Sequence, residues 1–216
     1  MSFLSELKNQ ANALQKKQAG TVLSTAAQTQ ACENACRVFL DYMEDLCAQL
    51  NVINPPALGN FSLDGKAPFP QMVLANFRSD ARQKMLRNNL VFDYIGLGWD
   101  GIPATGKVAT HSVAVNFPPD LERVVKRLGA GGIRHERKET RHPETQKLTA
   151  YIFEYETQFR GTLVVTPNHD TGHIAFRGTS MGGFELLTTT YPAGDVNGVL
   201  LDEIAKKICG HASRFT

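Results

Sequence analysis

A long stretch almost free of helix-breaking residues opens the chain and constrains its fold more than any other feature. From Phe3 to Leu50 there is no proline and only one glycine, Gly20. The apolar residues before Gly20 follow the 3-4-3 spacing of a coiled-coil seam: Leu4, Leu7, Ala11 and Leu14. This spacing loses register around Gly20, where we expect a bend, a short loop or a phase shift.

A second apolar face follows the loss of register. It consists of Ala31, Ala35, Val38, Phe39, Tyr42, Met43, Leu46 and Leu50, which share one side of a helix. A helix of this kind is not stable alone, because its apolar stripe must be covered. Either the segment folds at Gly20 into a helical hairpin on its own domain, or it pairs with the same helix of a second chain. The sequence leaves both arrangements open.

The composition then divides the chain into three regions. Asn54-Pro55-Pro56 ends the helical arm, which spans residues 1–53, and the Pro- and Gly-rich residues 54–69 are typical of a linker. Residues 70–216 form the remaining domain. Within 70–87, Val73, Phe77, Ala81 and Met85 recur every four residues, and this period predicts a helix.

Most of the remaining pattern is typical of strands. We expect strands at Leu90–Leu97 and Val108–Phe117, with a loop at 98–106 that includes Gly98-Trp99-Asp100-Gly101. A short helix begins at Pro118-Pro119 and ends near Gly129. A hairpin then joins Ile133–Thr140 to Leu148–Phe159, and its second arm places Tyr151, Phe153, Tyr155 and Phe159 on one face.

The last part of the chain reads as a meander followed by one helix. Strands are expected at Leu163–Thr166, His173–Thr179 and Phe184–Thr190, and the helix runs from an Asp195 N-cap to Gly210. The predicted fold class is therefore α+β. It has an N-terminal long helix or helical hairpin, then a mostly antiparallel β-sheet that the C-terminal helix covers over its aromatic face.

Charge and cysteine content narrow the class of protein. The net charge is +2, which gives no support to binding nucleic acid by charge alone. No run of about 18 apolar residues is present, so we expect no membrane span. The four cysteines are not spaced as a disulfide framework, and the start lacks a signal peptide. These features favour a cytoplasmic protein with reduced thiols and no cofactor.

Cations gather in one region of the sequence. Arg123, Lys126 and Arg127 form a stripe on the short helix, and the hairpin adds Arg134, Arg137, Lys138 and Arg141. If both groups faced one way, they would form an anion- or nucleic-acid-binding surface. Glu136, Glu139 and Glu144 lie among them, and this mixture is equally typical of a solvated, ion-paired edge strand.

Two further clusters contain metal-ligand residue types. His169 and His173 flank a turn and could face each other across it as ligands of a transition metal. Cys32 and Cys36 lie one helical turn apart, where two buried thiols are more typical of packing. Asp170 could add a carboxylate to the histidines, whereas the cysteines would need two further ligands and none is nearby in the sequence.

No nucleophile motif is present, so the sequence favours a binding protein over an enzyme. The main hypothesis is an interaction protein that forms homo-oligomers or binds a protein partner through its N-terminal helices. A nucleic-acid or phosphate-ligand binding module that uses the cations is the alternative. A metal-dependent enzyme at His169 and His173 is the third hypothesis.

Overall fold

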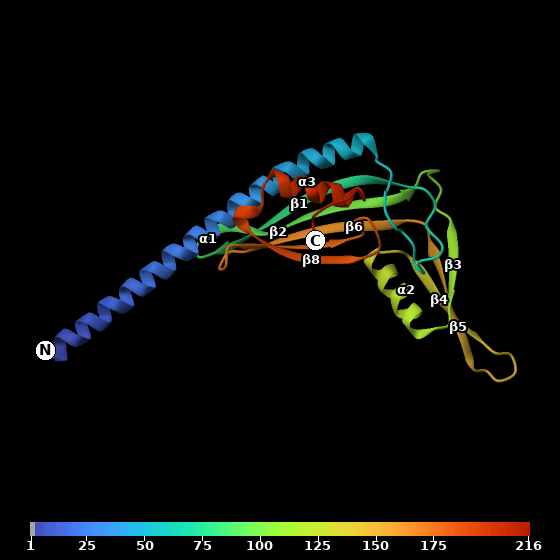
Figure 1. The fold of residues 1–216 in the computed structure, drawn as a ribbon, viewed down its shortest axis with the longest axis horizontal. Coiled ribbons are helices and arrows are strands. Elements are labelled where there is room, and N and C mark those ends of the chain that lie inside the picture. Colours follow the sequence, from blue (N-terminus) through green and yellow to red (C-terminus); the bar gives the residue numbers. More distant parts are fainter. Residues whose placement is uncertain (1–2) are drawn as a thin grey trace.

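The computed structural model describes the backbone of residues 3–216 and the side chains of residues 24–216. One continuous helix, α1 (Phe3–Ile53, 51 residues), opens the fold. Gly20 lies inside the helix, so the short loop and the helical hairpin, two of the alternatives at this position, do not form. Figure 1 shows the C-terminal half of α1 lying along the sheet, and the helix continuing past the sheet toward the N-terminus. The proposed seam side chains, Leu4 to Leu14, lie outside the described side chains.

The strands form two antiparallel sheets. The larger contains β1 (Met72–Leu86), β2 (Asn89–Pro103), β6 (Phe159–Asn168), β7 (His173–Thr179) and β8 (Leu186–Pro192), in the order β1-β2-β6-β7-β8. The smaller contains β3 (Thr110–Val115), β4 (His135–Arg141) and β5 (Leu148–Glu156), in the order β3-β5-β4. The predicted α+β class, long N-terminal helix, antiparallel sheet and C-terminal helix are confirmed.

Most of residues 70–87 form strand β1 and not the predicted helix. β1 pairs with β2 along its length, and the two-residue turn between them, Arg87 and Asn88, has φ of 50° and 64°. The register shifts between Ala75 and Arg78, where Asn76 has φ of 56°. This bulge changes the phase of the alternating pattern. The buried Phe77 therefore lies an odd number of residues from the buried Met72 and Leu74, and the sequence of β1 shows no regular alternation.

The glycines of the predicted loop at 98–106 lie inside strand β2 as far as Pro103. Gly101 faces Phe159 across the β2–β6 ladder, and a Cβ on Gly101 would lie 2.2 Å from that ring. Close packing against an aromatic ring explains this glycine, so it does not mark a turn.

Helix α1 and the C-terminal helix α3 (Gly198–Ile208) pack on the same face of the larger sheet (Figure 1). The tyrosine hydroxyl of Tyr42 donates a hydrogen bond to Asp202 at 2.6 Å and joins the two helices. Four residues of the predicted face are buried and three are partly buried against the core: Ala35, Phe39, Met43 and Leu50, and then Ala31, Tyr42 and Leu46. Val38 is 47% exposed. The helix also buries Cys32, Cys36 and Cys47. A short 3-10 turn, η1 (Ala193–Asp195), precedes α3.

The helix α3 begins later than predicted. Asn197, and not Asp195, is its N-cap, and the Asn197 side chain accepts hydrogen bonds from the backbone N–H groups of Val199 and Leu200 at 3.0 and 3.3 Å. Asp195 instead belongs to the preceding 3-10 turn.

The segment at 54–69 supplies core side chains. Phe61 stacks on Phe159 with ring centroids 4.5 Å apart, and Phe69 stacks on Tyr155 at 5.4 Å. Both rings also make edge contacts with Phe184, at 5.3 and 4.9 Å. This segment therefore covers Tyr155 and Phe159 of the predicted aromatic face, which the structure divides between β5 and β6.

Helix α2 (Pro118–Ala130) is the predicted short helix, although it continues past Gly129. Val124 and Leu128 are buried. Arg127 donates hydrogen bonds to the backbone carbonyls of Ser62 and Leu63 at 3.0 and 3.3 Å. Helix α2 is thereby attached to the 54–69 segment.

Candidate functional site at the junction of α1 and the sheet

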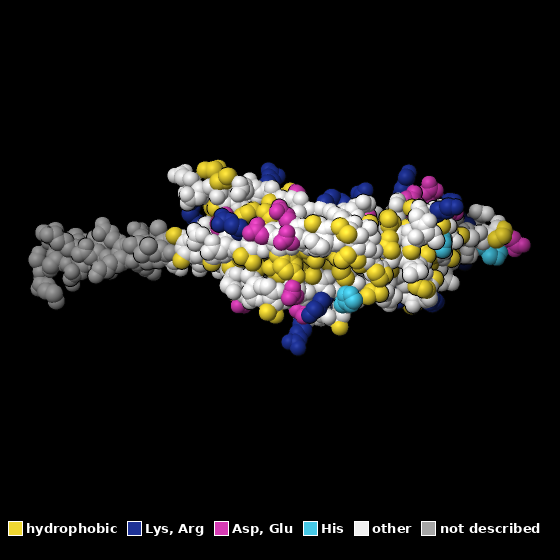
Figure 2. Space-filling model, turned by 90° about the horizontal axis from the view of Figure 1, so that it is seen from above, with side chains coloured by type: hydrophobic (Ala, Val, Ile, Leu, Met, Phe, Trp, Pro, Cys, Tyr) yellow, Lys and Arg dark blue, Asp and Glu magenta, His cyan; other side chains and the backbone are white. Residues whose placement is uncertain are grey.

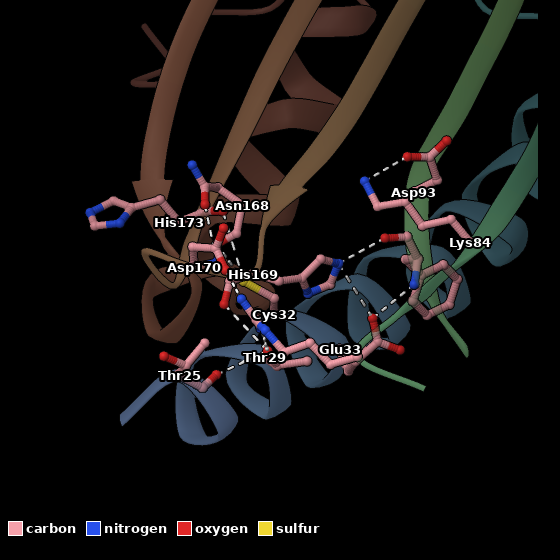
Figure 3. Close-up of polar contacts among 12 residues, drawn as sticks. Thr25, Thr29, Cys32, Glu33, Lys84, Asp93, Asn168, His169, Asp170 and His173 are labelled. Carbon is pink, nitrogen blue, oxygen red and sulfur yellow. Dashed lines mark hydrogen bonds and ion pairs between the residues drawn. The ribbon is translucent and has the colours of Figure 1, made fainter. Parts of the chain in front are cut away.

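Three parts of the fold converge on a polar junction, which we define as Thr29, Glu33, Arg87, Phe92, His169 and Asp170 (Figure 3). Helix α1 supplies Thr29 and Glu33. The β1–β2 hairpin supplies Arg87 and Phe92, and the turn after β6 supplies His169 and Asp170. The junction is built from segments far apart in the sequence.

Glu33 and His169 bind the same residue of β2. Glu33 Oε1 accepts a hydrogen bond from the backbone N–H of Phe92 at 2.8 Å, and His169 Nε2 lies 2.8 Å from the Phe92 carbonyl. A carbonyl is an acceptor only, so we assign the Nε2 proton to His169. His169 is 4% exposed, and its Nδ1 is buried without a hydrogen-bond partner among the described residues.

The second half of the junction is more exposed. Arg87 pairs with Asp170 and donates to Thr29 Oγ1 at 3.4 Å. Thr29 Oγ1 also lies 3.3 Å from the backbone carbonyl of His169. The positive φ of Arg87 in the hairpin turn places its side chain beside α1. These contacts fasten the hairpin tip and the β6–β7 turn to the same helical turn.

Buried thiols complete the contact between α1 and the turn. Cys32 Sγ lies 3.4 Å from the carbonyl oxygen of Asn168 and 3.8 Å from that of His173. Burial, and then the nearby Glu33 carboxylate, raise the pKa of Cys32 to about 11 and that of Cys36 to about 12. Both thiols are therefore protonated near neutral pH, a state unsuited to nucleophilic attack or metal binding.

A cavity of about 640 Å³ opens beside the junction. Its lining mixes charged groups with apolar side chains and consists of Thr25, Ala26, Thr29, Gln30, Glu33, Arg37, Leu86, Arg87, Asn89, Leu90 and Val91. Within this lining, Glu33 and Arg87 are already engaged in contacts inside the protein. The arrangement fixes the helix on the sheet, and we find no nucleophile paired with a base among these residues.

The structure does not bring the two histidines together. His169 points inward toward Phe92 and Glu33, whereas the exposed His173 points away and its Nδ1 lies 2.8 Å from the Thr171 carbonyl (Figure 3). Residues 24–216 contain no cluster of three or more His, Cys, Asp or Glu side chains arranged to hold a metal. The described geometry thus gives no support to the metal hypothesis.

The predicted cations of α2 lie beside the β7–β8 connection. Arg123, Lys126 and Arg127 line a cavity of about 380 Å³ together with Phe184, Glu185 and Leu186. Arg123 is paired with Asp120, and Arg127 is bound to the carbonyls of the 54–69 segment.

Most cations of the β4 region have acidic partners. Arg134 lies 3.6 Å from Glu156, Lys138 lies 2.5 Å from Glu154, and Arg141 lies 2.7 Å from Glu139; these distances join nitrogen to carboxylate oxygen. The guanidinium carbon of Arg137 lies 4.6 Å from the centre of the Tyr151 ring. These side chains are exposed, and all but Arg137 are ion-paired, as expected for a charged edge strand.

Sequence reasoning did not find the junction. Glu33 follows no recognisable motif, and the turn Asn168-His169-Asp170 predicts only a reversal of the chain. The burial of a carboxylate and an imidazole against one peptide group depends on how α1 packs, which local sequence does not encode.

Comparison with known proteins gives no relative to compare with this site. No family model, curated protein or solved structure matches the chain. Within the described residues, no helix combines the length and the hydropathy needed to span a membrane.

Proposed function

We propose that this chain is an interaction protein that self-associates through the N-terminal part of α1. The observation that carries the proposal is the length of α1 relative to its contact with the sheet. Helix α1 is continuous from Phe3 to Ile53, and its buried residues in the described part run from Cys32 to Leu50. At 1.5 Å per residue, roughly 44 Å of helix separates Phe3 from Cys32.

The junction gives this extension a fixed direction. Glu33 binds strand β2 and Thr29 contacts the turn after β6, both at the start of the buried part of α1. A helix held in this way leaves the sheet in a defined direction, so two copies can meet without first ordering a loop.

The sequence supplies a seam for the contact. Leu4, Leu7, Ala11 and Leu14 occupy a and d positions over two heptads, and the next positions of the seam are Gln18 and Thr21. Because isolated helices shorter than about 12–15 residues are marginal, an apolar seam this short supports a weak and concentration-dependent dimer. A protein partner with a matching helix would use the same seam.

Charge substitution in the seam tests the proposal. The variant Leu7→Asp/Leu14→Asp should show a smaller concentration-dependent increase in mass than the wild-type chain, measured by sedimentation equilibrium on the full chain. Its matched control, Asn9→Asp/Asn12→Asp, introduces two carboxylates outside the a and d positions and should keep the wild-type increase. A wild-type chain that stays monomeric at every concentration would refute the proposal.

Binding of a phosphate or nucleic acid receives less support from the geometry. The cations of α2 and β4 lie mostly in internal pairs, and on the face shown in Figure 2 basic side chains alternate with acidic ones. The test is the salt dependence of binding to a random-sequence duplex, compared with that of Arg134→Glu/Arg137→Glu. An unchanged affinity in that variant would remove this alternative.

A further inference from the structure

Four strands form the edges of the two sheets: β1 and β8 in the larger, β3 and β4 in the smaller. An edge strand presents unpaired backbone groups, and proteins usually protect it with charges, bulges or proline. β4 has the sequence HERKETR, and β1 combines Arg78, Arg82 and Lys84 with two register shifts. Both edges are protected against pairing with another chain.

β3 lacks this protection. Its sequence is THSVAV, with no acidic or basic residue other than His111, no proline and no register shift against β5. Thr110, Ser112 and Ala114 are exposed. The strand is therefore a flat, uncharged edge.

The pairing with β5 shows which backbone groups of β3 are free. Thr157 N–H donates to the Ala109 carbonyl at 2.9 Å, so Ala109 faces β5. Directions alternate along an antiparallel ladder, so His111, Val113 and Val115 also bond to β5. The N–H and C=O groups of Thr110, Ser112 and Ala114 consequently point outward. No hydrogen bond to these outward groups is found from any part of the chain that the structure describes.

An apolar surface continues from the end of β3. Phe117 is 59% exposed and Leu148 42% exposed, and Val108, just before the strand, is 46% exposed. Phe117 and Leu148 line a cavity of about 320 Å³ that contains no charged side chain; the other lining residues are Val115, Asn116, Pro118, Leu121, Thr149, Ala150 and Tyr151. Pairing at β3 would bring a neighbouring chain next to this surface.

β8 is also uncharged, but its surroundings differ. The cavity at its start is lined by Arg123, Lys126 and Arg127 together with Glu185. A chain arriving there would meet these charges, whereas the cavity beside β3 has no charged side chain in its lining. β8 therefore serves as a comparison within the same molecule.

We infer that β3 pairs antiparallel with β3 of a second copy, centred on Ser112, and joins the two smaller sheets into one. The edge is complementary to itself. Ser112 lies opposite Ser112 of the other copy, and Thr110 lies opposite Ala114, so no two like charges meet. The same pairing at β4, centred on its outward-facing Arg137, would place Arg137 opposite Arg137 of the other copy. This contact goes beyond the α1 association and does not depend on it.

The contact is small, since β3 has six residues, and it belongs to the weak or transient class of interfaces. Two twofold contacts on different surfaces link copies into chains, whereas either contact alone stops at a dimer. The wild-type chain should therefore exceed the mass of a dimer at high concentration. Loss of one contact should limit it to a dimer, and loss of both to a monomer.

Ser112→Pro is the sharpest test. The Ser112 N–H points outward, so proline removes no hydrogen bond of the monomer but blocks pairing with a second copy. Ser112→Lys is a second variant that adds a charge to the edge. The matched control is Thr190→Pro on β8. The Ala193 N–H donates to the Gly172 carbonyl, so Ala193 faces β7. Directions alternate along the strand, so the N–H of Thr190 points outward.

The expected result has two parts, both measured on the full chain. Ser112→Pro and Ser112→Lys, combined with Leu7→Asp/Leu14→Asp, should be monomers, whereas Thr190→Pro in that background should remain a dimer. Amide hydrogen exchange at Thr110, Ser112 and Ala114 should slow as concentration rises, and exchange at Thr188 and Thr190 should not.

Each proposal fails separately. If exchange at Ser112 is fast at every concentration, or if Leu7→Asp/Leu14→Asp is already monomeric, the β3 contact does not form and the α1 contact stands. If Ser112→Pro alone is monomeric, β3 carries the association and the α1 proposal is wrong.

Discussion

Glu33 on α1 and His169 after β6 bind the two polar groups of a single residue, Phe92. The carboxylate takes the backbone N–H, the imidazole donates to the carbonyl, and Glu33 Oε1 lies 3.9 Å from His169 Nε2. Helix, hairpin and turn are thus joined through one peptide segment. The direction in which α1 leaves the sheet depends on these two side chains.

Removal of the Glu33 carboxylate should destabilise the fold. Glu33→Ala leaves the Phe92 N–H without its partner, and we expect a loss of about 1–3 kcal/mol in the free energy of unfolding, measured by urea denaturation. Glu33→Gln keeps an acceptor oxygen and should lose less. Asp41→Ala removes an exposed carboxylate from the same helix and should change the free energy by no more than about 0.5 kcal/mol.

The same pair can be tested for coupling. Since Glu33 and His169 share one partner, the double variant Glu33→Ala/His169→Ala should lose less than the sum of the single losses, by about 0.5–3 kcal/mol. Strictly additive losses would show that the two side chains act independently.

The C-terminal tail should detach from α3 at acidic pH. Glu203 accepts hydrogen bonds from Lys206 Nζ at 2.6 Å and from the Arg214 N–H at 2.5 Å, and these contacts lower its pKa to about 2 from a usual 4.5. A carboxylate with a lowered pKa stabilises the folded state above pH 4.5, and this contribution is lost as the pH falls toward 2.

The tail carries Phe215, which is buried with its ring centre 5.6 Å from that of Phe176. The NMR shifts of Phe215 should therefore change between pH 4.5 and 2 in the wild type. In Glu203→Gln they should have lost this dependence, and the exposed Glu122→Gln should behave as the wild type. An unchanged titration in Glu203→Gln would assign the transition to another group.

Sequence patterns were reliable where one interaction dominated a segment. The β4–β5 hairpin was predicted because its second arm alternates aromatic and acidic residues, and α2 because Pro118-Pro119 precedes a helical stripe. The prediction of a helix at 70–87 failed because the bulge at Asn76 shifts the alternation of strand β1, so Phe77 is buried together with Met72 and Leu74. A bulge is fixed by pairing with a distant strand, and a local window does not contain that information.

The candidate site was less predictable than the fold. Cys32 and Cys36 were correctly placed on the covered face of a helix, since their spacing is one turn. Glu33 lies between them, and its sequence context is typical of a solvated charge. Its carboxylate nevertheless binds the backbone N–H of Phe92, 59 residues away. The sequence could not predict the free edge of β3 either. Strand order decides which strand has a neighbour on only one side, and a local sequence pattern does not contain the strand order.

The buried thiols should resist alkylation in the folded protein. The attacking species is the thiolate, and burial raises the pKa of Cys32 to about 11 and of Cys36 to about 12. Iodoacetamide at pH 8 should leave both unmodified by mass spectrometry, and urea should make all four cysteines reactive. Folding disfavours the thiolate, so the protonated thiol contributes to stability. This contribution is fully present below pH 9, the usual pKa of the thiol, and is lost as the pH rises toward 12. Labelling of Cys32 before unfolding would contradict its burial.

Replacement of Gly161 by a larger residue should destabilise the fold, because the ring of Trp99 packs over this glycine. The two residues lie opposite each other in the β2–β6 ladder, and a Cβ on Gly161 would lie 2.0 Å from the indole ring. The indole has no room to retreat, since it is fully buried and stacks on Phe77 with ring centres 6.1 Å apart. Gly161→Ala should therefore displace the ring and cost about 1–3 kcal/mol through overpacking.

Trp99 is the single tryptophan of the chain, so its fluorescence reports this displacement directly. Gly161→Ala should shift the emission to the red and lower the midpoint of urea unfolding. Gly129→Ala is the control: its Cβ would meet no atom within 4 Å, and alanine within helix α2 should be neutral or stabilising by up to about 1 kcal/mol. If Gly161→Ala keeps both the emission and the midpoint, the indole does not pack over this glycine, and the close approach of β2 and β6 that positions the whole core face is wrong.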